Sequence, residues 1–540
     1  MIGMGFLWTG SQIPLYLWGA IPPYIYRELG GLDRWVWFVL GGLLSLGAVC
    51  PFVGSMSDLM GRRYVALLGS GLLVLSTVLA ACAQSMGMFI AAMTIVGAGA
   101  GIAELTALAV TSELAPTAKR GKYVAILIFT IIPFVPSGIY AQLIAREYFS
   151  AWTCDTGLTD SFTDYSSWRY IGAIVCTWNG IGFLLVFIFY HPPARVNTLG
   201  KTKKQVLSEM DFIGGFLSIA GMILFLAGLQ WGGYQYPWTS AHVLAPMLLG
   251  LALMAGFCVW ESKFAKHPMF PGRIKQNPRI LLLTLLITFI SGMIFFAYLM
   301  FWPTQSFNVY GHDPIAVGVK LLPGGMAILA GACVTLWLLS VFRGRNKELM
   351  IMSSILMTAG TGAMACLTRE NLYVAWPLLI IGGFGIGGIV VPASIITTII
   401  CPDDLIATVS ALTLSIRVIG GAIGYTIYFN IFVAKFTQNA IHYIGGVMAT
   451  QLGITNETYI ISAIEITGVS LLEELKHIPG IAGNETAYQM VVYAGQVAYA
   501  ESYKWVYIAS VAAGVISIIA ACFLGDISQY MDDHVAVIIH

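Results

Sequence analysis

The sequence predicts an all-α protein that crosses a lipid bilayer fourteen times, as two six-helix bundles with two further helices inserted between them. Three observations support this fold class. Of the 540 residues, 58% are hydrophobic and 10% are charged, and the mean hydropathy is +0.81, whereas soluble domains are about 25% charged. Apolar runs of about 20 residues, long enough to cross the hydrocarbon core, recur along the whole chain. Two distant parts of the chain also repeat one glycine pattern.

Each apolar run is assigned to one helix in chain order. The first is interpreted as a membrane span because it is too long for the hydrophobic region of a signal peptide and its first basic residue, Arg27, follows it. An even number of spans places both termini on one side. The runs cover residues 3–24, 35–53, 64–83, 89–112, 124–144, 170–190, 212–229, 241–260, 280–301, 316–341, 349–367, 374–400, 406–433 and 505–524.

The positions of Lys and Arg predict which side is cytoplasmic, because these residues accumulate in short cytoplasmic loops. With the amino terminus inside, the inner loops hold most of the 27 Lys and Arg residues. Both termini are therefore predicted to be cytoplasmic. The long loop at about 436–501 then lies outside, and its Asn456-Glu-Thr and Asn484-Glu-Thr sequences predict two glycosylation sites. The inner-loop cations include Arg62, Arg63, Lys119, Arg120, Lys122, Arg195, Lys201, Lys203, Lys204, Arg273 and Arg345.

An internal repeat predicts the arrangement of the spans. A shift of 286 residues, the spacing from Gly97 to Gly383, brings several glycines and one loop proline into register. Both copies point the same way across the membrane, as in a parallel duplication around a central substrate site. We therefore expect bundles at 1–190 and 279–540 and two inserted helices within 191–278. The matched pairs are Gly97 and Gly383, Gly99 and Gly385, Gly101 and Gly387, Pro116 and Pro402, and Gly138 and Gly424.

The loop after the second predicted helix contains Gly54, Asp58, Gly61, Arg62 and Arg63. The first glycine lets helices approach, the second permits a tight turn, and the aspartate can face the amino terminus of a neighbouring helix. The arginines suit a cytoplasmic surface. An ordinary basic turn is the alternative interpretation, but the whole segment resembles the loop signature of the major facilitator superfamily.

This resemblance implies a conformational gate near the cytoplasmic side. Asp58 would face the helix that begins after Pro402, and Arg62 or Arg63 would pair with Glu113, with Arg120 in the same gate. The equivalent place in the second half, Phe342-Arg-Gly-Arg345, keeps only a glycine and an arginine of the signature. An aspartate-dependent gate is therefore expected in the first half alone.

Further motifs are spread over nearly the whole chain, among them Ala103-Glu-Leu105, Ser112-Glu-Leu-Ala-Pro116 and Phe301-Trp-Pro-Thr-Gln305. They resemble the fungal trichothecene efflux pump family, which adjoins the siderophore transporters and the fourteen-helix drug:proton antiporters. The resemblance implies proton-driven transport of an organic solute, usually outward, in a fungal plasma membrane. Two departures are the absence of a charged cytoplasmic head and an antiporter signature reduced to Pro136-Ser-Gly138. The motifs are Ala103-Glu-Leu105, Ser112-Glu-Leu-Ala-Pro116, Arg120-Gly121, His191-Pro-Pro193, Gly228-Leu-Gln-Trp-Gly-Gly233, Tyr236-Pro-Trp238, Phe301-Trp-Pro-Thr-Gln305 and Tyr530-Met-Asp-Asp-His534.

Two charged residues fall deep within predicted spans, where a charge costs about 3 kcal/mol or more. Glu104 lies on the Gly97–Gly101 stripe, and Arg417 lies beside Gly421 and Gly424, which with the repeated glycines are expected to pack helices. Glu104 is predicted to couple protons. If Arg417 lay within about 5 Å, however, the two would form a structural latch instead.

Gln305 is expected to face an external vestibule of the cavity. An enzyme is not expected, because no two of the eight histidines lie within four residues and no phosphate-binding loop occurs. We therefore expect no metal and no cofactor, with the proton gradient as energy source.

The expected partners are a small organic substrate, protons and the lipid bilayer. The net charge of +1 excludes nucleic acid, and a monomer is expected. Siderophore-iron uptake and a non-transporting sensor are the alternative functions. A vacuolar or other internal membrane is the alternative to the plasma membrane.

Overall fold

A computed structural model describes residues 1–31, 34, 36–145, 167–192, 205, 210–233, 236–311, 313–468 and 472–531. These residues are mostly helical and contain no extended strand within the described ranges. The predicted inner-loop cations Arg195, Lys201, Lys203 and Lys204 lie outside the described residues, as do residues 532–534 of the tail motif.

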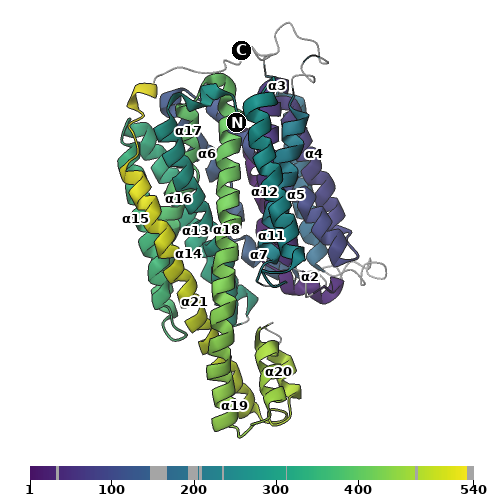
Figure 1. Ribbon diagram of the computed structural model, residues 1–540. Coiled ribbons are helices and arrows are strands. Elements are labelled where there is room, and N and C mark those ends of the chain that lie inside the picture. Colours follow the sequence, from purple (N-terminus) through teal and green to yellow (C-terminus); the bar gives the residue numbers. More distant parts are fainter. Residues whose placement is uncertain are drawn as a thin grey trace, which may run out of the picture.

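The amino-terminal helices pack into one group around α5, which contacts both α3 and α4. A short helix, α2 (Pro22–Leu29), follows α1 at one end of this group (Figure 1). The group contains α1 (Ile2–Trp18), α3 (Val36–Met60), α4 (Arg62–Ala81), α5 (Met86–Leu114), α6 (Arg120–Phe129), α7 (Ser137–Ala145) and α9 (Tyr170–Phe189).

The carboxy-terminal helices form a second group, in which α16 contacts both α14 and α15. Pro392 begins a new helix directly after α16, so one predicted span becomes the pair α16 and α17. The group contains α13 (Pro278–Tyr310), α14 (Pro314–Val341), α15 (Asn346–Ala363), α16 (Leu372–Val390), α17 (Pro392–Ile399), α18 (Ile406–Ala440) and α21 (Glu485–Cys522).

Two helices from the middle of the chain, α11 (Phe212–Trp231) and α12 (Ala241–Val259), pack against each other beside the two groups. Helix α11 contacts α3 of the first group and α18 of the second. The Gln230 side chain donates a 2.9 Å hydrogen bond to the Ala422 carbonyl oxygen. The pair therefore covers one seam between the groups.

Twelve helices among the described residues are long and apolar enough to cross a membrane. The fourteen expected spans are thus not all present as single long helices. Helix α1 has only 17 residues, and the fifth expected span is divided into α6 and α7. Pro133 and Pro136 lie in this interruption. Proline breaks a helix because it removes a backbone donor and clashes with the preceding turn.

The segment predicted as a loop at about 436–501 is instead largely helical. Helix α18 continues through a π-turn (Ile441–Gly445) into α19 (Gly446–Thr450), and α20 (Glu457–Gly468) follows. The continuous helical stretch of 48 residues corresponds to about 70 Å, more than twice the roughly 30 Å hydrocarbon core. Hydropathy alone could not reveal this helix because its outer part is not apolar enough to be read as a span.

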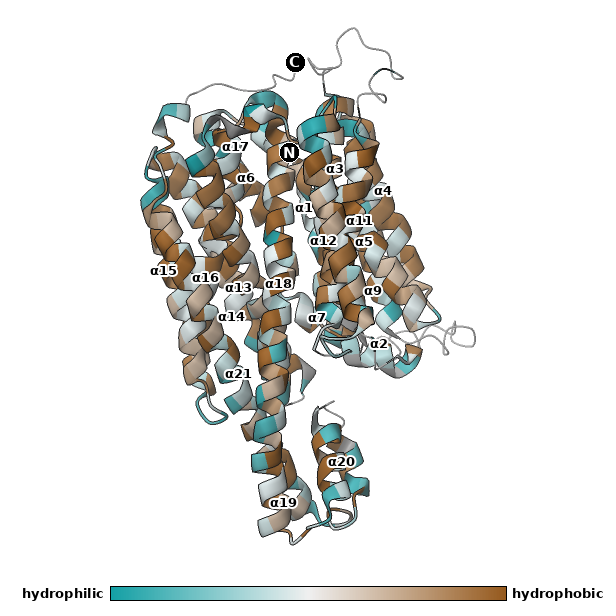
Figure 2. Ribbon diagram, viewed as in Figure 1, coloured by the Kyte–Doolittle hydropathy of each residue, from teal (hydrophilic) through white to brown (hydrophobic). Residues whose placement is uncertain are grey.

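Aromatic stacking joins the long helices in this region. The rings of Phe436 and Tyr499 lie 4.3 Å apart, and those of Phe432 and Tyr503 lie 4.6 Å apart. Figure 1 shows α19 and α20 protruding at the end opposite the amino terminus. We call the end that holds the start of α1 the inner end, and the end that holds α19 and α20 the outer end. Figure 2 shows hydrophobic residues along the bundle helices, with hydrophilic residues gathered at the inner end and on the protruding helices.

Candidate functional site

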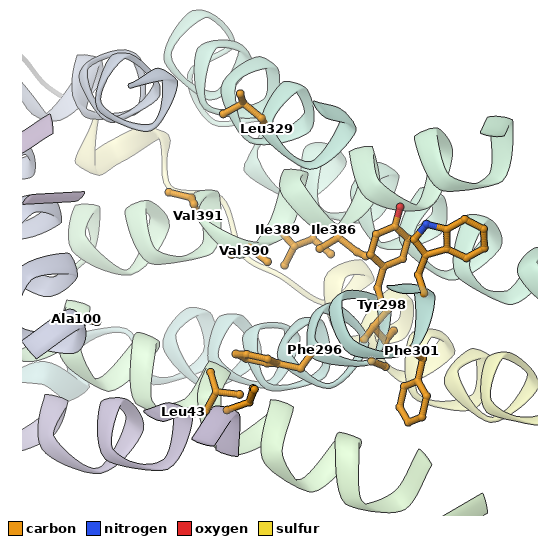
Figure 3. Packing of buried hydrophobic residues seen from close by; sticks show 14 of the residues in the cluster. Leu43, Ala100, Phe296, Tyr298, Phe301, Leu329, Ile386, Ile389, Val390 and Val391 are labelled. Carbon is orange, nitrogen blue, oxygen red and sulfur yellow. The ribbon is translucent and has the colours of Figure 1, made fainter. Parts of the chain in front are cut away.

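A cavity of about 270 Å³ lies between the two helix groups. Its walls come from α1, α3, α5, α6, α7, α13, α14, α16 and α18, and most of the lining side chains are apolar. Figure 3 shows Leu43, Phe296, Leu329 and Val390 arranged around one space between helices of both groups. This volume is just below the range of about 300–1,000 Å³ that is usual for small-molecule sites, so the cavity suits a compact organic ligand.

Most lining residues lie in the middle or the outer part of their helices, although Val390 is the last residue of α16 and Glu104 lies past the middle of α5 toward the inner end. On α1 and the turn after it they run from Trp8 to Ala20. On α13, which begins at the inner end with Pro278, they run from Phe295 to Pro303. The described part of the inner half between the groups is instead occupied by helix contacts. The cavity therefore lies mainly in the outer half of the protein, and its deep end reaches past the middle.

Glu104 and Arg417 meet at the deep end of this cavity. An Arg417 Nη2 atom lies 2.7 Å from Glu104 Oε1, and the Gln12 amide donates to Glu104 Oε2 at 3.0 Å. Arg417 also donates to the Val390 carbonyl oxygen at 3.4 Å. Glu104 is 2% exposed and Arg417 is 8% exposed. The pair is therefore buried, and both carboxylate oxygens have partners.

This distance bears directly on the two interpretations of Glu104. A separation well below 5 Å meets the condition set for the structural latch in this conformation. Glu104 belongs to α5 of the first group and Arg417 to α18 of the second. The ion pair consequently links the two groups, with Gln12 of α1 as a third member that sequence reasoning missed. A glutamine in an apolar run was the available signal.

Gln305 does not lie where the sequence analysis placed it. Its side chain is 1% exposed and is not among the residues that line the cavity. The Tyr507 hydroxyl of α21 donates a 2.6 Å hydrogen bond to Gln305 Oε1. The expectation of a vestibule residue was wrong because Gln305 is buried among helices of the second group.

At the inner end, Asp58 connects α3 to the first turn of α18. Its Oδ2 atom accepts hydrogen bonds from the Thr408 backbone N–H at 2.9 Å and from the Thr408 hydroxyl at 2.7 Å. The unpaired N–H groups and the dipole of a helix amino terminus stabilise a carboxylate there. This is the contact expected for Asp58, and it joins the two helix groups.

Arg62, not Arg63, occupies the buried position beside Asp58. Arg62 Nη2 lies 2.6 Å from Asp58 Oδ1, Nε donates to Glu113 Oε1 at 3.1 Å, and Nη1 donates to Ser57 Oγ at 2.7 Å. Arg63 instead donates to the Phe187 carbonyl oxygen at the surface. The guanidinium of Arg62 thus holds two carboxylates that would otherwise repel each other.

Arg120 makes a second polar connection between the groups. It donates to the Thr398 carbonyl oxygen at 2.7 Å and lies 3.3 Å from Asp403 Oδ1. The adjacent Asp404 pairs with Arg273 at 2.7 Å. Sequence reasoning missed both aspartates, although two acids just before a helix are a recognisable amino-terminal signal.

The predicted packing glycines lie at close helix contacts. A side chain on Gly97 or Gly101 would meet α3, and one on Gly99 would meet α4. In the second group, Gly383 and Gly387 face α14 and Gly385 faces α15. Gly421 and Gly424 face α13, Gly54 faces α18, and Gly61 has the positive φ of +91° that the turn between α3 and α4 requires.

The asparagines of both glycosylation sequons directly precede helices in the outer part of the protein, Asn456 before α20 and Asn484 before α21. Asn456 and Asn484 are exposed, and each side chain accepts a hydrogen bond from a backbone N–H at the start of α20 or α21. Their position leaves them accessible to modification at the outer end.

Comparison with known proteins gives one family. The family described as fungal trichothecene efflux pump (TRI12) matches residues 23–540. The trichothecene efflux pump TRI12 of Fusarium sporotrichioides is 25% identical over 89% of this chain and 78% of its own length. The transporter gkaD of Penicillium citrinum is 29% identical over 68% of this chain and 59% of its own, and the efflux transporter ffsH of Aspergillus flavipes is 26% identical over 72% and 65%. The chain thus spans about three fifths of the length of gkaD and ffsH.

Solved structures share the fold at low identity. The human organic anion transporter MFSD10 is 13% identical with a TM-score of 0.55, over 95% of this chain and 98% of that chain. The major facilitator transporter FucP is 13% identical with a TM-score of 0.52, over 97% of each chain. These likenesses show the major facilitator fold.

Proposed function

Because the chain belongs to the fungal trichothecene efflux pump family of major facilitator transporters, we propose that it exports small organic compounds by alternating access. The observation that supports this most is the cavity between the helix groups, which lies mainly in the outer half while polar contacts join the groups at the inner end. Rocking of the two groups would exchange these positions and expose the cavity to the inner side.

The proposed topology has fourteen spans, with α1 and the interrupted pair α6 and α7 crossing the membrane in addition to the twelve long helices. Both termini would then be cytoplasmic, and α19 and α20 would be extracellular. The start of α1 and the turn Ser528–Tyr530, close to the last described residue, both lie at the inner end (Figure 1). This arrangement supports an even number of crossings. We place this monomer in the plasma membrane.

The lining suggests what the substrate resembles. Apolar side chains cover most of the cavity. The polar groups include those of Gln12, Tyr16, Ser137, Tyr298 and the Glu104–Arg417 pair, together with the indole N–H groups of Trp8 and Trp302. A largely apolar carbon skeleton with a few hydrogen-bonding oxygens or nitrogens fits this surface. Fungal toxins, including the trichothecenes for which the family is named, and azole drugs have such a structure.

We propose that Glu104 couples protons in addition to forming the latch with Arg417. The two roles are compatible because the two residues belong to helix groups that separate during rocking. A buried carboxylate that has lost its cationic partner holds a proton more readily. Proton binding from the outer side and release to the inner side would then drive the substrate in the opposite direction.

The direction can be measured in inside-out membrane vesicles from cells that overproduce the protein. An acidic lumen should drive accumulation of a labelled trichothecene or azole, and a protonophore should abolish it. A ferric siderophore added to the same assay should neither accumulate nor compete. Siderophore uptake in intact cells, with no accumulation of toxin or drug in vesicles, would contradict the proposed export.

A further inference from the structure

The two halves of the protein can be aligned through their glycine contacts. Side chains on Gly97 and Gly101 would meet the carbonyl oxygens of Gly42 and Leu46 in α3. Their counterparts Gly383 and Gly387 face the carbonyl oxygens of Gly324 and Ile328 in α14. Continuing along both helices at this register places Ser340 of α14 on Asp58 of α3. The register of Pro116 and Pro402 likewise places Lys122 of α6 on Thr408 of α18.

Ser340 makes the same bond in its half that Asp58 makes in the other. The Lys122 backbone N–H donates to Ser340 Oγ at 3.0 Å, as the Thr408 N–H donates to Asp58. Each donor is the third residue of its helix, since α6 begins at Arg120 and α18 at Ile406. The Ser340 hydroxyl itself donates to the Leu336 carbonyl oxygen at 3.2 Å. Both bonds join the first helix group to the second.

The helix crossings beneath these bonds also correspond. A Cβ on Gly54 of α3 would lie 3.1 Å from the Ala407 carbonyl oxygen in α18. A Cβ on Gly121 of α6 would lie 2.5 Å from the Leu336 carbonyl oxygen in α14. One glycine per crossing thus brings the two backbones together, and Leu336 aligns with Gly54.

The two charged residues that accompany Asp58 in the first half, Arg62 and Glu113, have uncharged counterparts in the second half. Arg62, the first residue of α4, corresponds to Asn346, the first residue of α15, whose side chain donates to the Gly525 carbonyl oxygen at 2.8 Å. Glu113 corresponds to Ile399, which is buried. The Ser340 hydroxyl is a neutral acceptor and needs neither a cation like Arg62 nor an acid like Glu113. The three differences between the halves, at the positions of Asp58, Arg62 and Glu113, are therefore consistent with one another.

We propose that Ser340 is the gate residue of the second half, so that the inner gate consists of a charged latch between α3 and α18 and a neutral latch between α6 and α14. This rests on the proposed alternating access. Hydrogen bonds to charged acceptors are roughly twice as strong as neutral ones. The neutral latch between α6 and α14 is therefore the weaker of the two bonds, although rocking opens both seams together.

Hydrogen–deuterium exchange of the purified full-length protein in lipid nanodiscs measures the protection of the backbone amides that donate the hydrogen bond of each latch. Peptides covering 118–126 and 404–412 report the Lys122 and Thr408 amides. Ser340→Ala should raise exchange in both segments by roughly five-fold, the factor for one neutral hydrogen bond, because rocking opens both seams together. Ser340→Asp should slow exchange in both.

The matched control is Ser55→Ala. The Ser55 hydroxyl is also half-exposed on the inner part of a bundle helix, but it donates only to the Phe52 carbonyl oxygen of its own helix. This variant should leave both segments unchanged. A change confined to 118–126 in Ser340→Ala would mean a local helix cap and would overturn the proposal, as would an equal effect of Ser55→Ala.

A double variant tests whether the latch can be moved. Asp58→Asn should raise exchange in both segments, and Asp58→Asn/Ser340→Asp should recover part of the protection in both. No recovery with a correctly folded protein would contradict the proposal. Hydrogen–deuterium exchange needs neither a substrate nor a proton gradient, so its result does not depend on the transport assays. If the protein transports none of the compounds tested but both segments respond together, the proposed export is contradicted and the Ser340 gate is supported.

Discussion

The guanidinium of Arg417 and the carboxylate of Glu104 belong to opposite helix groups and lie 2.7 Å apart at the deep end of the cavity. Each is buried, and each is the only charged side chain that lines the described cavity with its sign. Any motion that separates the groups at this depth must part them. The pair is thus a structural link between the helix groups and the place where we propose that protons are coupled.

The first prediction concerns stability. Glu104→Gln and Arg417→Gln should each destabilise the protein by about 3–5 kcal/mol, because each leaves one buried charge without its partner. The double substitution should recover part of this loss, since no uncompensated charge remains. Thermal unfolding of the purified proteins in detergent measures the differences. Additive losses in the double variant would show that the pair is not coupled.

The second prediction concerns the inner gate. Asp58→Asn should reduce transport severely while surface abundance stays near normal, because the neutral amide binds the amino terminus of α18 and the Arg62 guanidinium less strongly. Asp526→Asn is a suitable control, since Asp526 lies at the inner end and accepts hydrogen bonds from the backbone N–H and the hydroxyl of the neighbouring Ser528. Transport at the wild-type rate in Asp58→Asn would reject the gating role.

The third prediction separates two adjacent arginines. Arg62→Gln should cost about 3–5 kcal/mol of stability, because it leaves Asp58 and Glu113 buried without a cation. Arg63→Gln should change the free energy of unfolding by no more than about 0.5 kcal/mol, as is usual for a surface substitution. Unfolding of both variants under one condition makes the comparison. Equal losses would mean that the buried network does not hold the inner end together.

These predictions show what the sequence could and could not reveal. The contact of Asp58 with the helix after Pro402 was predictable because a loop signature fixes both residue type and place. The close contacts of Gly97 and Gly383 followed from one repeat. Ser340 was not predictable, because a serine has no motif of its own and only the aligned contacts identify it.

Other errors have physical causes of the same kind. Hydropathy detects apolar length, so it merged α6 with α7 across Pro133 and Pro136 and ended α18 before its outer helical continuation. It also could not tell which face of α13 carries Gln305. Facing is set by packing against α21, which is distant in sequence.

The fourth prediction concerns topology. Glycosidase treatment should increase gel mobility for the wild type but not for Asn456→Gln/Asn484→Gln, because both exposed asparagines directly precede helices in the proposed extracellular part. Each single variant should show an intermediate shift. An epitope inserted after Ala482, in a turn before α21, should stain intact cells. Staining that requires permeabilised cells would place these helices inside.

The most direct measurement uses proteoliposomes that contain wild-type or Glu104→Gln protein and a labelled substrate, with and without an imposed pH gradient. The wild type should accumulate substrate against its gradient only when protons can flow the other way. Glu104→Gln should lose this accumulation yet retain substrate exchange at equal pH, because the neutral amide resembles the protonated carboxyl. Gradient-driven accumulation in Glu104→Gln with an unchanged pH dependence would contradict proton coupling at Glu104.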